Sequence, residues 1–439
     1  MWRGRSVATP RAPAAAARNS RSVTAPSRSI IEVVSNPRSV VRAVKTATVR
    51  GFRFSGVRAG IKAEGLDLAL IASDTPAAAA GVFTRSTVVG APVEVSRALL
   101  RSGWARGVVV NSGISNVAMG ARGLRDAKAM SLAASRAIDA ASGEVLVAST
   151  GVIGEPLPMA KIRSGVRAAA AALSEHGLPD AARAIMTTDT FPKQASRRIR
   201  LGGRDVVIAG IAKGSGMIEP DMATMLAFLV TDAQAAPAFL RGVLRRSAAV
   251  SFNRVTVDGE SSTSDSALLL ANGASGAPLL RGPRSPGAKR FEAAVAEVAT
   301  DLARDLARDG EGATKLVTVR VTGARSAAEA ERGARRIANS LLVKTAIFGG
   351  DPNWGRILQT LGAGRVALRL ERTEVKLCGV VVFRRGSSAG PAARRRAAAK
   401  HAAPEIEIEV KLGAGRASAT IWTCDLSYDY VKINAEYTT

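Results

Sequence analysis

The sequence predicts an α/β fold, because helix-like and strand-like segments alternate along the chain. Short β-rich runs that lie close to turn residues predict strands at 66–72, 107–111 and 144–149. Apolar residues that recur every three or four positions predict helices at 123–141, 159–175 and 289–308. The last of these helices meets Asp309 and Gly310, a pair typical of a helix stop. This mixed order favours helices layered on sheets.

The C-terminal part of the chain continues the same pattern. An amphipathic helix with a basic face is predicted at 327–344. A half-exposed strand is predicted at 405–412, where charged residues alternate with Ile and Val. The segment 386–403, which contains His401, is basic and rich in Ala, and we expect a solvated loop there. Trp354 is expected in the core.

Length and charge narrow the class of protein. A chain of 439 residues with 47% apolar residues can form one large domain or two ordinary ones. No apolar run approaches the roughly 18 residues of a membrane-spanning helix, so no membrane association is expected. The net charge is +26, but the basic cluster at 384–400 lacks interleaved aromatic residues, and only 4% of the chain is aromatic. We therefore expect no nucleic-acid partner.

The first 50 residues differ from the rest of the chain. They are rich in Arg, Ser, Ala and Pro, carry about a third of the net charge, and contain Glu32 as their only acid. This composition fits a mitochondrial or plastid transit peptide, and equally a disordered extension or a misassigned start. We expect a cytoplasmic protein, with the mitochondrial matrix or plastid as the alternative.

Histidine and cysteine are scarce. Neither His176 nor His401 stands in a recognisable site, which argues against a Ser-His-Asp triad or a histidine-rich metal centre. Two cysteines, Cys378 and Cys424, cannot form a four-cysteine zinc site and are expected to be buried. No P-loop or dinucleotide fingerprint is present. We expect no metal and no cofactor.

The most informative segment is 213–226, which reads K-G-S-G-M-I-E-P-D-M-A-T-M-L between two apolar runs. Gly214, Gly216 and Pro220 suit an ordinary turn between two strands. A turn of this kind can also present the Ala223 carbonyl to the Thr224 hydroxyl. If the bond between them breaks, the new amine of Thr224 can act as the base for its own hydroxyl.

This segment resembles the self-cleavage site of the ornithine acetyltransferase (glutamate N-acetyltransferase) family, and the resemblance covers roughly residues 51–439. The other motifs that carry it are G-V-F-T at 81–84, N-S-G at 111–113, S-T-G-V-I-G at 149–154, M-T-T-D-T at 186–190, S-F-N-R-V-T-V-D-G at 251–259, D-G-E-G-A-T-K at 309–315, V-K-T-A-I-F-G at 343–349, D-P-N-W-G-R-I at 351–357 and the tail Y-V-K-I-N-A-E-Y-T-T. The family has a layered sandwich with helices outside and sheets inside, similar to N-terminal nucleophile hydrolases. The resemblance thus divides this chain into an extension, 1–50, an alpha chain, 51–223, and a beta chain, 224–439.

The resemblance also implies an activity. Members transfer the acetyl group of N-acetyl-L-ornithine to L-glutamate through an acetyl-threonine, in the cyclic pathway of arginine biosynthesis. Bifunctional members also use acetyl-CoA, and the motifs do not separate them from monofunctional ones. The implied assembly is a heterotetramer of two alpha and two beta chains. An amidase or aminopeptidase of the N-terminal nucleophile type, which releases the acyl group to water, remains the alternative.

The family's site residues map onto matching positions here. Thr224 would be the nucleophile and Ala223–Thr224 the cleaved bond, with Thr150 and Gly151 forming the oxyanion hole. The positions that resemble substrate contacts are Thr187, Lys213, Thr224, Glu311, Asn434 and Thr439. The chain departs from the family at Ile114 and Ser115, where N-A is common. The apolar tail predicts that Tyr428, Tyr430 and Val431 are buried.

Overall fold

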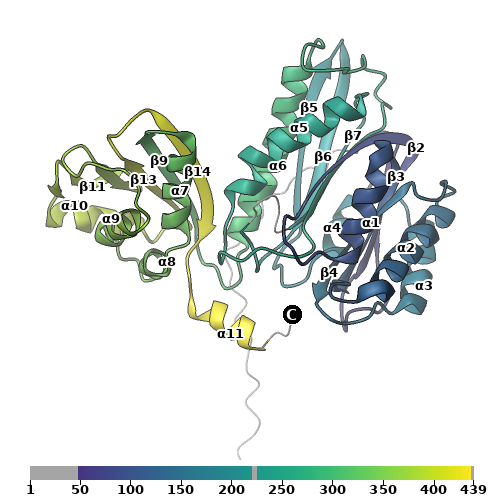
Figure 1. Cartoon of the computed structure of the whole chain (residues 1–439), viewed down its shortest axis with the longest axis horizontal. Helices are drawn as coiled ribbons and strands as arrows, with labels where there is room; N and C mark the ends of the chain where they lie inside the picture. Colours follow the sequence, from purple (N-terminus) through teal and green to yellow (C-terminus); the bar gives the residue numbers. More distant parts are fainter. Residues whose placement is uncertain (1–47, 220–224, 437–439) are drawn as a thin grey trace, which may run out of the picture. The chain divides into compact units, whose positions relative to one another are not determined.

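The computed structural model describes residues 48–219 and 225–436. Its larger sheet has eight strands in the order β4-β3-β2-β8-β7-β6-β5, with β1 paired to β2 (Figure 1). Its strands are β1 Phe52–Val57, β2 Leu68–Phe83, β3 Trp104–Ile114, β4 Val145–Val152, β5 Lys193–Leu201, β6 Arg204–Lys213, β7 Leu226–Thr231 and β8 Ser266–Ala271. The predicted strands at 66–72, 107–111 and 144–149 are confirmed as β2, β3 and β4, although β2 begins only at Leu68 and β4 at Val145.

This one sheet supplies two layers of the fold. β2 pairs with β1 through its first half and with β8 through its second half, and its register against β3 shifts between Ala72 and Ala77. The inner faces of the two halves share one apolar core, which contains Ile71 from one half and Phe228 from the other. The sheet therefore folds back against itself, and its two outer faces are left for helices.

Helices cover both outer faces. The helices on the β2–β3–β4 side are α1 Ala91–Leu99, α2 Gly120–Ala137 and α3 Met159–Ala171, and those on the other side are α5 Pro237–Val250 and α6 Ala288–Arg308 (Figure 1). The short helix α4, Leu178–Ala184, packs in the inner core. The α/β class and the layered sandwich with helices outside are thus confirmed. The helices predicted at 123–141, 159–175 and 289–308 are α2, α3 and α6.

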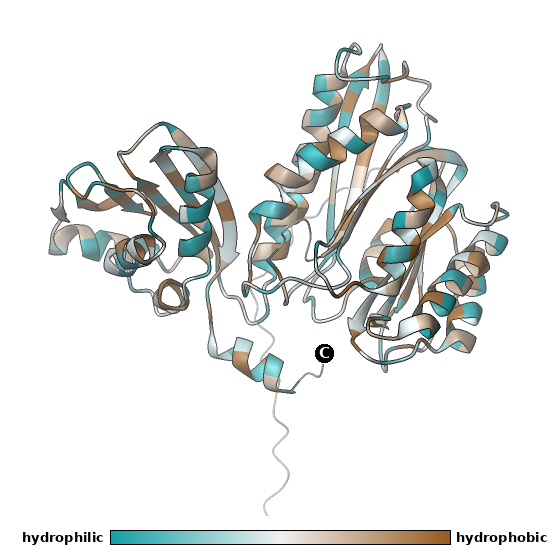
Figure 2. Cartoon of the chain, viewed as in Figure 1, coloured by the Kyte–Doolittle hydropathy of each residue, from teal (hydrophilic) through white to brown (hydrophobic). Residues whose placement is uncertain are grey.

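A second sheet has six strands in the order β12-β11-β10-β13-β9-β14. Its elements are β9 Leu316–Ala324, α7 Ala327–Ala338, α8 Leu341–Phe348, α9 Trp354–Ala363, β10 Glu374–Leu377, β11 Val380–Arg384, β12 Ser387–Ser388, α10 Pro391–Lys400, β13 Glu405–Lys411 and β14 Ala417–Cys424. β13 buries Ile406, Ile408 and Val410 and turns its glutamates outward, as predicted for 405–412. Figure 2 shows hydrophobic colour along the strands and both colours alternating on the helices, as expected of helices with one buried face.

Two predictions in this region are wrong. The expected single helix at 327–344 is two helices, because Ser340 caps α8 by accepting a hydrogen bond from the Val343 N–H. The expected loop at 386–403 contains α10. Ala, Arg and Lys favour helix, and Ala393 and Ala397 give this helix a buried face. His401 ends it and is buried, with its Nδ1 2.9 Å from the Ala397 carbonyl oxygen.

The tail is also packed differently from expectation. Residues Tyr428–Glu436 form helix α11, which has no buried residue; Tyr428 is 84% exposed and Val431 66% exposed. The prediction that these side chains are buried is therefore wrong. Cys378 is likewise only half-buried, because it occupies a turn with φ 49°, whereas Cys424 is buried. Trp354 is partly buried, with its ring centroid 5.0 Å from that of Phe383.

Candidate active site

A cavity of about 370 Å³ lies where several strands of the larger sheet end. Its lining includes Thr150, Gly151, Thr187, Lys213, Glu311 and Asn434, all of which the sequence singled out. Further lining comes from Ser115, Ile153, Thr188, Gly214, Gly216, Met217, Met225, Leu226, Asp258, Tyr430 and the continuous run 260–265. The tertiary structure thus brings together residues that are far apart in the chain. Ala223, Thr224 and Thr439 lie outside the described residues.

The strand pairing explains why the segment 213–226 borders this cavity. β6 and β7 are antiparallel neighbours in which Lys213 pairs with Leu226. β7 and β8 are parallel neighbours in which Leu226 pairs with Ser266. The segment therefore connects two adjacent strands, and its flanks stand beside the start of β8. β7 is buried along its whole length, as a central strand with a continuous apolar sequence should be.

Lys213 is the cation of the cavity. Its Nζ donates to Thr187 Oγ1 at 2.8 Å and to Thr150 Oγ1 at 3.3 Å, and lies 3.9 Å from Asp189 Oδ2. Burial lowers the pKa of Lys213, and the charge of Asp189 opposes that shift. A solvated turn lysine, the ordinary alternative for this position, would have none of these contacts. The lysine is therefore held in place before any ligand binds.

Behind Lys213 lies a buried ionic network that the sequence analysis missed. Lys193 Nζ lies 2.7 Å from Asp189 Oδ1 and 2.5 Å from Asp309 Oδ2, and all three side chains are almost fully buried. Asp189 also accepts a hydrogen bond of 2.6 Å from the Gly214 N–H. Burial alone would raise the pKa of Asp189, but the charges of Lys193 and Lys213 hold it below its usual range. Asp189 lies in the motif at 186–190 and Asp309 in the motif at 309–315. These motif matches were the sequence signal that could have identified both aspartates.

The Thr150–Gly151 pair ends β4 in a conformation that requires glycine. Gly151 has φ 126°, and a Cβ at this position would lie 2.2 Å from the Gly113 carbonyl carbon. The backbone at Gly151 therefore lies directly against Gly113 of β3, where no side chain fits. Lys213 donates to the Thr150 oxygen, so the hydroxyl proton of Thr150 is directed elsewhere. A backbone N–H and a hydroxyl proton are the donors that an oxyanion needs.

Glu311 and helix α11 form another part of the cavity wall. The Glu311 N–H donates to the Ser215 carbonyl at 2.9 Å, and a Cβ on Gly216 would come within 2.3 Å of Glu311 Oε2. Asn434 Nδ2 donates to Glu311 Oε2 at 2.8 Å. This contact ties α11 to the cavity although the helix buries no residue.

Asp258 connects the backbone at Met217 and Ile218, in the segment after β6, to helix α11. It accepts hydrogen bonds from the Met217 and Ile218 N–H groups at 2.6 and 2.8 Å, and one of 3.4 Å from the Tyr430 hydroxyl. Burial raises the pKa of Tyr430 to about 12, so this hydroxyl stays a donor at neutral pH. Arg356, whose position in the 351–357 motif would allow it to line the site, instead donates to the Leu342 carbonyl and does not line the cavity.

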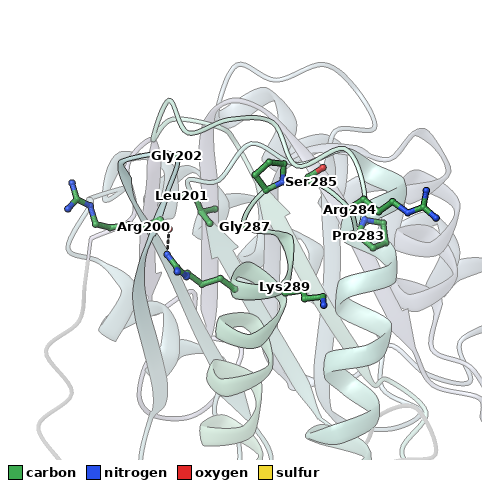
Figure 3. A pocket seen from close by; sticks show the side chains of 10 residues that line it. Arg200, Leu201, Gly202, Pro283, Arg284, Ser285, Gly287 and Lys289 are labelled. Carbon is green, nitrogen blue, oxygen red and sulfur yellow. Dashed lines mark hydrogen bonds between the residues drawn. The ribbon is translucent and has the colours of Figure 1, made fainter.

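A second cavity, of about 650 Å³, lies at the other end of β6, around the β5–β6 hairpin and the start of α6 (Figure 3). Its side chains include Arg200, Arg284 and Lys289, and none of the predicted site residues lines it. Within the described ranges, 48–219 and 225–436, no helix is long and apolar enough to cross a membrane. The same ranges contain no group of three or more His, Cys, Asp or Glu side chains arranged to hold a metal ion.

The layered α/β fold with this cavity, taken together with the family match that follows, is that of an acyltransferase. The chain belongs to the ArgJ family, whose model matches residues 53–439. The arginine biosynthesis bifunctional protein ArgJ of Geobacter sulfurreducens is 50% identical over 392 residues, which are 89% of this chain and 100% of that protein. Its counterpart in Symbiobacterium thermophilum is 48% identical over 394 residues, 89% of this chain and 97% of that protein.

A solved structure is also similar in sequence: ornithine acetyltransferase complexed with ornithine, from Mycobacterium tuberculosis. It is 37% identical, covers 40% of this chain and 93% of that one, and superposes with a TM-score of 0.35. The resemblance stated from the motifs at 149–154, 309–315 and 351–357 is confirmed by the family match.

Proposed function

We propose that this protein transfers the acetyl group of N-acetyl-L-ornithine to L-glutamate in arginine biosynthesis, with Thr224 as the nucleophile. The observation that carries the proposal is the convergence of Lys213, Thr187, Thr150 and Gly151 in one cavity that Met225, the residue after Thr224, also lines. Family membership and the names of the relatives support the same activity.

The cavity offers a role for each group. Both substrates carry an α-carboxylate, and Lys213 with the Thr187 hydroxyl is a compact cationic site for it. The Gly151 N–H and the Thr150 hydroxyl would stabilise the oxyanion of each tetrahedral intermediate, where loss of one donor typically costs about 3 kcal/mol. Glu311, steadied by Asn434, would hold a substrate ammonium group.

The chemistry then runs in two half-reactions. The Thr224 hydroxyl attacks the acetyl carbonyl, its proton goes to the Thr224 amine, and that proton passes to the departing amine of ornithine. The amine of glutamate attacks the acetyl ester and restores the hydroxyl. The covalent intermediate predicts ping-pong kinetics.

Several finer points belong to the same proposal. Cleavage before Thr224 would give chains that end at Ala223 and begin at Thr224. We propose a tetramer of two alpha and two beta chains in the cytoplasm, working without metal or coenzyme, with acetyl-CoA as a second donor. Size-exclusion chromatography with light scattering tests the assembly. Activity abolished by EDTA and restored by zinc would contradict the metal-free mechanism.

One experiment tests the core of the proposal. Purified wild-type protein and Thr224→Ala are compared by intact mass, by ornithine release and by N-acetylglutamate formation. The wild type should give a chain that begins at Thr224 and form N-acetylglutamate, whereas Thr224→Ala should stay one chain and be inactive. Two fragments with the same boundary in Thr224→Ala would refute the assignment. Acetate formed in place of N-acetylglutamate would favour the amidase alternative.

A further inference from the structure

The cavity contains a buried carboxyl group with no assigned task. Asp265 lies just before β8, is 2% exposed and lines the cavity. Its Oδ2 has no hydrogen-bond partner among the described residues. A buried carboxylate oxygen without a partner is costly, so its retention calls for an explanation.

The strand register places Asp265 beside the start of β7. Leu226 pairs with Ser266 in parallel register, and the Ser266 N–H donates to the Met225 carbonyl at 3.0 Å. Asp265 is therefore the neighbour of Met225 across the sheet. Lys213 ends β6 on the other side of β7. The residue bonded to Met225 is Thr224, the proposed nucleophile.

The proposed self-cleavage lacks a base at its first step. In the finished enzyme the amine of Thr224 can accept the hydroxyl proton, but in the uncut chain that nitrogen is an amide and is not basic. Neither histidine lines the cavity. Lys213 already donates to two threonine oxygens and is paired with Asp189, so it is a donor and not a base. Self-cleavage therefore requires another proton acceptor.

We propose that Asp265 is the general base for self-cleavage, an inference that rests on the proposed function. Its carboxylate takes the proton of the Thr224 hydroxyl as the Thr224 oxygen bonds to the Ala223 carbonyl carbon. The C–N bond between residues 223 and 224 then breaks, and Asp265 returns the proton to the nitrogen. Water hydrolyses the resulting ester, which leaves a carboxyl group on Ala223 and a free hydroxyl and amine on Thr224.

The surroundings of Asp265 suit this task. Burial raises the pKa of the Asp265 carboxyl well above its usual range, and the Ser262 side chain and the charge of Lys213 oppose that rise. A carboxylate with a raised pKa is a stronger base. The other ionisable side chains that line the cavity are Asp258, Glu260, Glu311 and Tyr430. Of these, Asp258 and Glu311 are hydrogen-bonded as described above.

Asp232 provides a matched control at the opposite end of β7. It is fully buried, burial likewise raises its pKa, and its Oδ2 has no hydrogen-bond partner, although Arg50 lies 3.7 Å away. It does not line the cavity. A general effect of neutralising a buried aspartate should therefore appear at Asp232 as well as at Asp265.

The test follows self-cleavage of freshly translated full-length chain on a denaturing gel, with intact mass as a check. Asp265→Asn should slow cleavage by about a hundredfold or more, the usual contribution of a general base, whereas Asp265→Glu should retain cleavage and Asp232→Asn should match the wild type. The wild-type rate should rise with pH as Asp265 ionises, and Asp265→Asn should lose this dependence. Thr224→Ala, with and without Asp265→Asn, supplies uncut chains whose thermal unfolding is compared to check folding.

Each outcome decides the matter. Cleavage of Asp265→Asn at the wild-type rate overturns the inference, as does a wild-type rate that is constant from about pH 5 to about pH 9. Equal slowing in Asp232→Asn, or a folded Asp265→Glu that does not cleave, also overturns it. A wild type that never cleaves would instead refute the proposed function itself.

Discussion

The two sheets of this protein bury charged side chains in different settings. Around the eight-stranded sheet, Lys193, Lys213 and Asp265 are buried near strand ends, and Lys213 and Asp265 line the cavity. Around the six-stranded sheet, charges on the strands such as Arg320 and Glu407 are exposed, and the helices α7 and α8 bury Glu329 and Lys344. Burying charge costs stability unless each charge is paired. The buried charges of the first sheet are the ones that border space a ligand can fill.

One buried lysine in each region sharpens this contrast. Lys213 contacts two threonine hydroxyls at the edge of an open cavity. Lys344, on α8, is 3% exposed and donates to Thr423 Oγ1 at 3.0 Å and to the Cys424 carbonyl. Lys344 thus completes the hydrogen bonds of a strand end, whereas Lys213 faces space that a ligand can fill.

Replacing each of these two lysines by methionine should separate the two regions most clearly. Lys213→Met should lower kcat/KM for acetyl transfer on the order of a hundredfold, because a hydrogen bond to a charged group contributes roughly 2–3 kcal/mol. Lys344→Met should leave kcat/KM unchanged but lower the free energy of unfolding by about 1–3 kcal/mol, because it leaves a buried carbonyl without its partner. Steady-state kinetics and urea unfolding measure both quantities. An equal loss of transfer in both variants would break the comparison between the regions.

At the tail, we expect transfer to be lost without a loss of stability. Deleting residues 434–439 should abolish transfer and spare self-cleavage, because Asn434 steadies Glu311 while cleavage uses the 213–226 segment. Stability should change little, because α11 has no buried residue. Chain separation on a gel and ornithine release are measured on one truncated protein.

Two point variants on the same helix refine the tail experiment. Asn434→Ala should weaken transfer, whereas Val431→Ala, at a position 66% exposed, should have no effect. Full transfer activity in the truncated protein would remove the tail from the site.

The smallest effect concerns the dependence of stability on pH. The folded-state pKa of Asp189 is depressed below 3.8, its ordinary value, so its contribution to stability is present above that pH and is lost as the pH falls through the folded pKa. The difference in unfolding free energy between wild type and Asp189→Asn should therefore be constant near neutrality and shrink in acid. Urea unfolding across that range is the measurement. A difference that grows in acid would show that Asp189 is not held ionised by Lys193 and Lys213.

The motifs predicted the residues that line the site but not the buried ionic network behind them. Motif matching named Thr150, Thr187, Lys213, Glu311 and Asn434, and the structure places them around one cavity. It did not indicate that Asp189 and Asp309 share Lys193, because the aspartates are 120 positions apart and pair only after β5 and α6 pack together. Asp265 was missed for the same reason, since its proximity to Met225 depends on the parallel register of β7 and β8.

Two predictions from local sequence were wrong because packing against other parts of the chain decided the structure. The basic composition of 386–403 predicts a loop, but Ala393 and Ala397 pack against a core and a helix forms over Pro391–Lys400. The apolar tail predicts burial of Tyr428 and Val431, but α11 keeps both exposed and is attached through polar contacts such as that of Asn434 with Glu311.

By itself, the sequence determined the α/β class, the main helices and strands, and the identity of the family. Hydrophobic periodicity, composition and the order of the motifs can all be read from the linear sequence without knowing the fold. Only the tertiary structure decided that one sheet folds into two layers, that Lys213 and Asp265 flank β7, and that α11 reaches Glu311. Each of these depends on strand register and on packing between distant segments, and a register shift of one residue would turn every side chain of a strand to the other face.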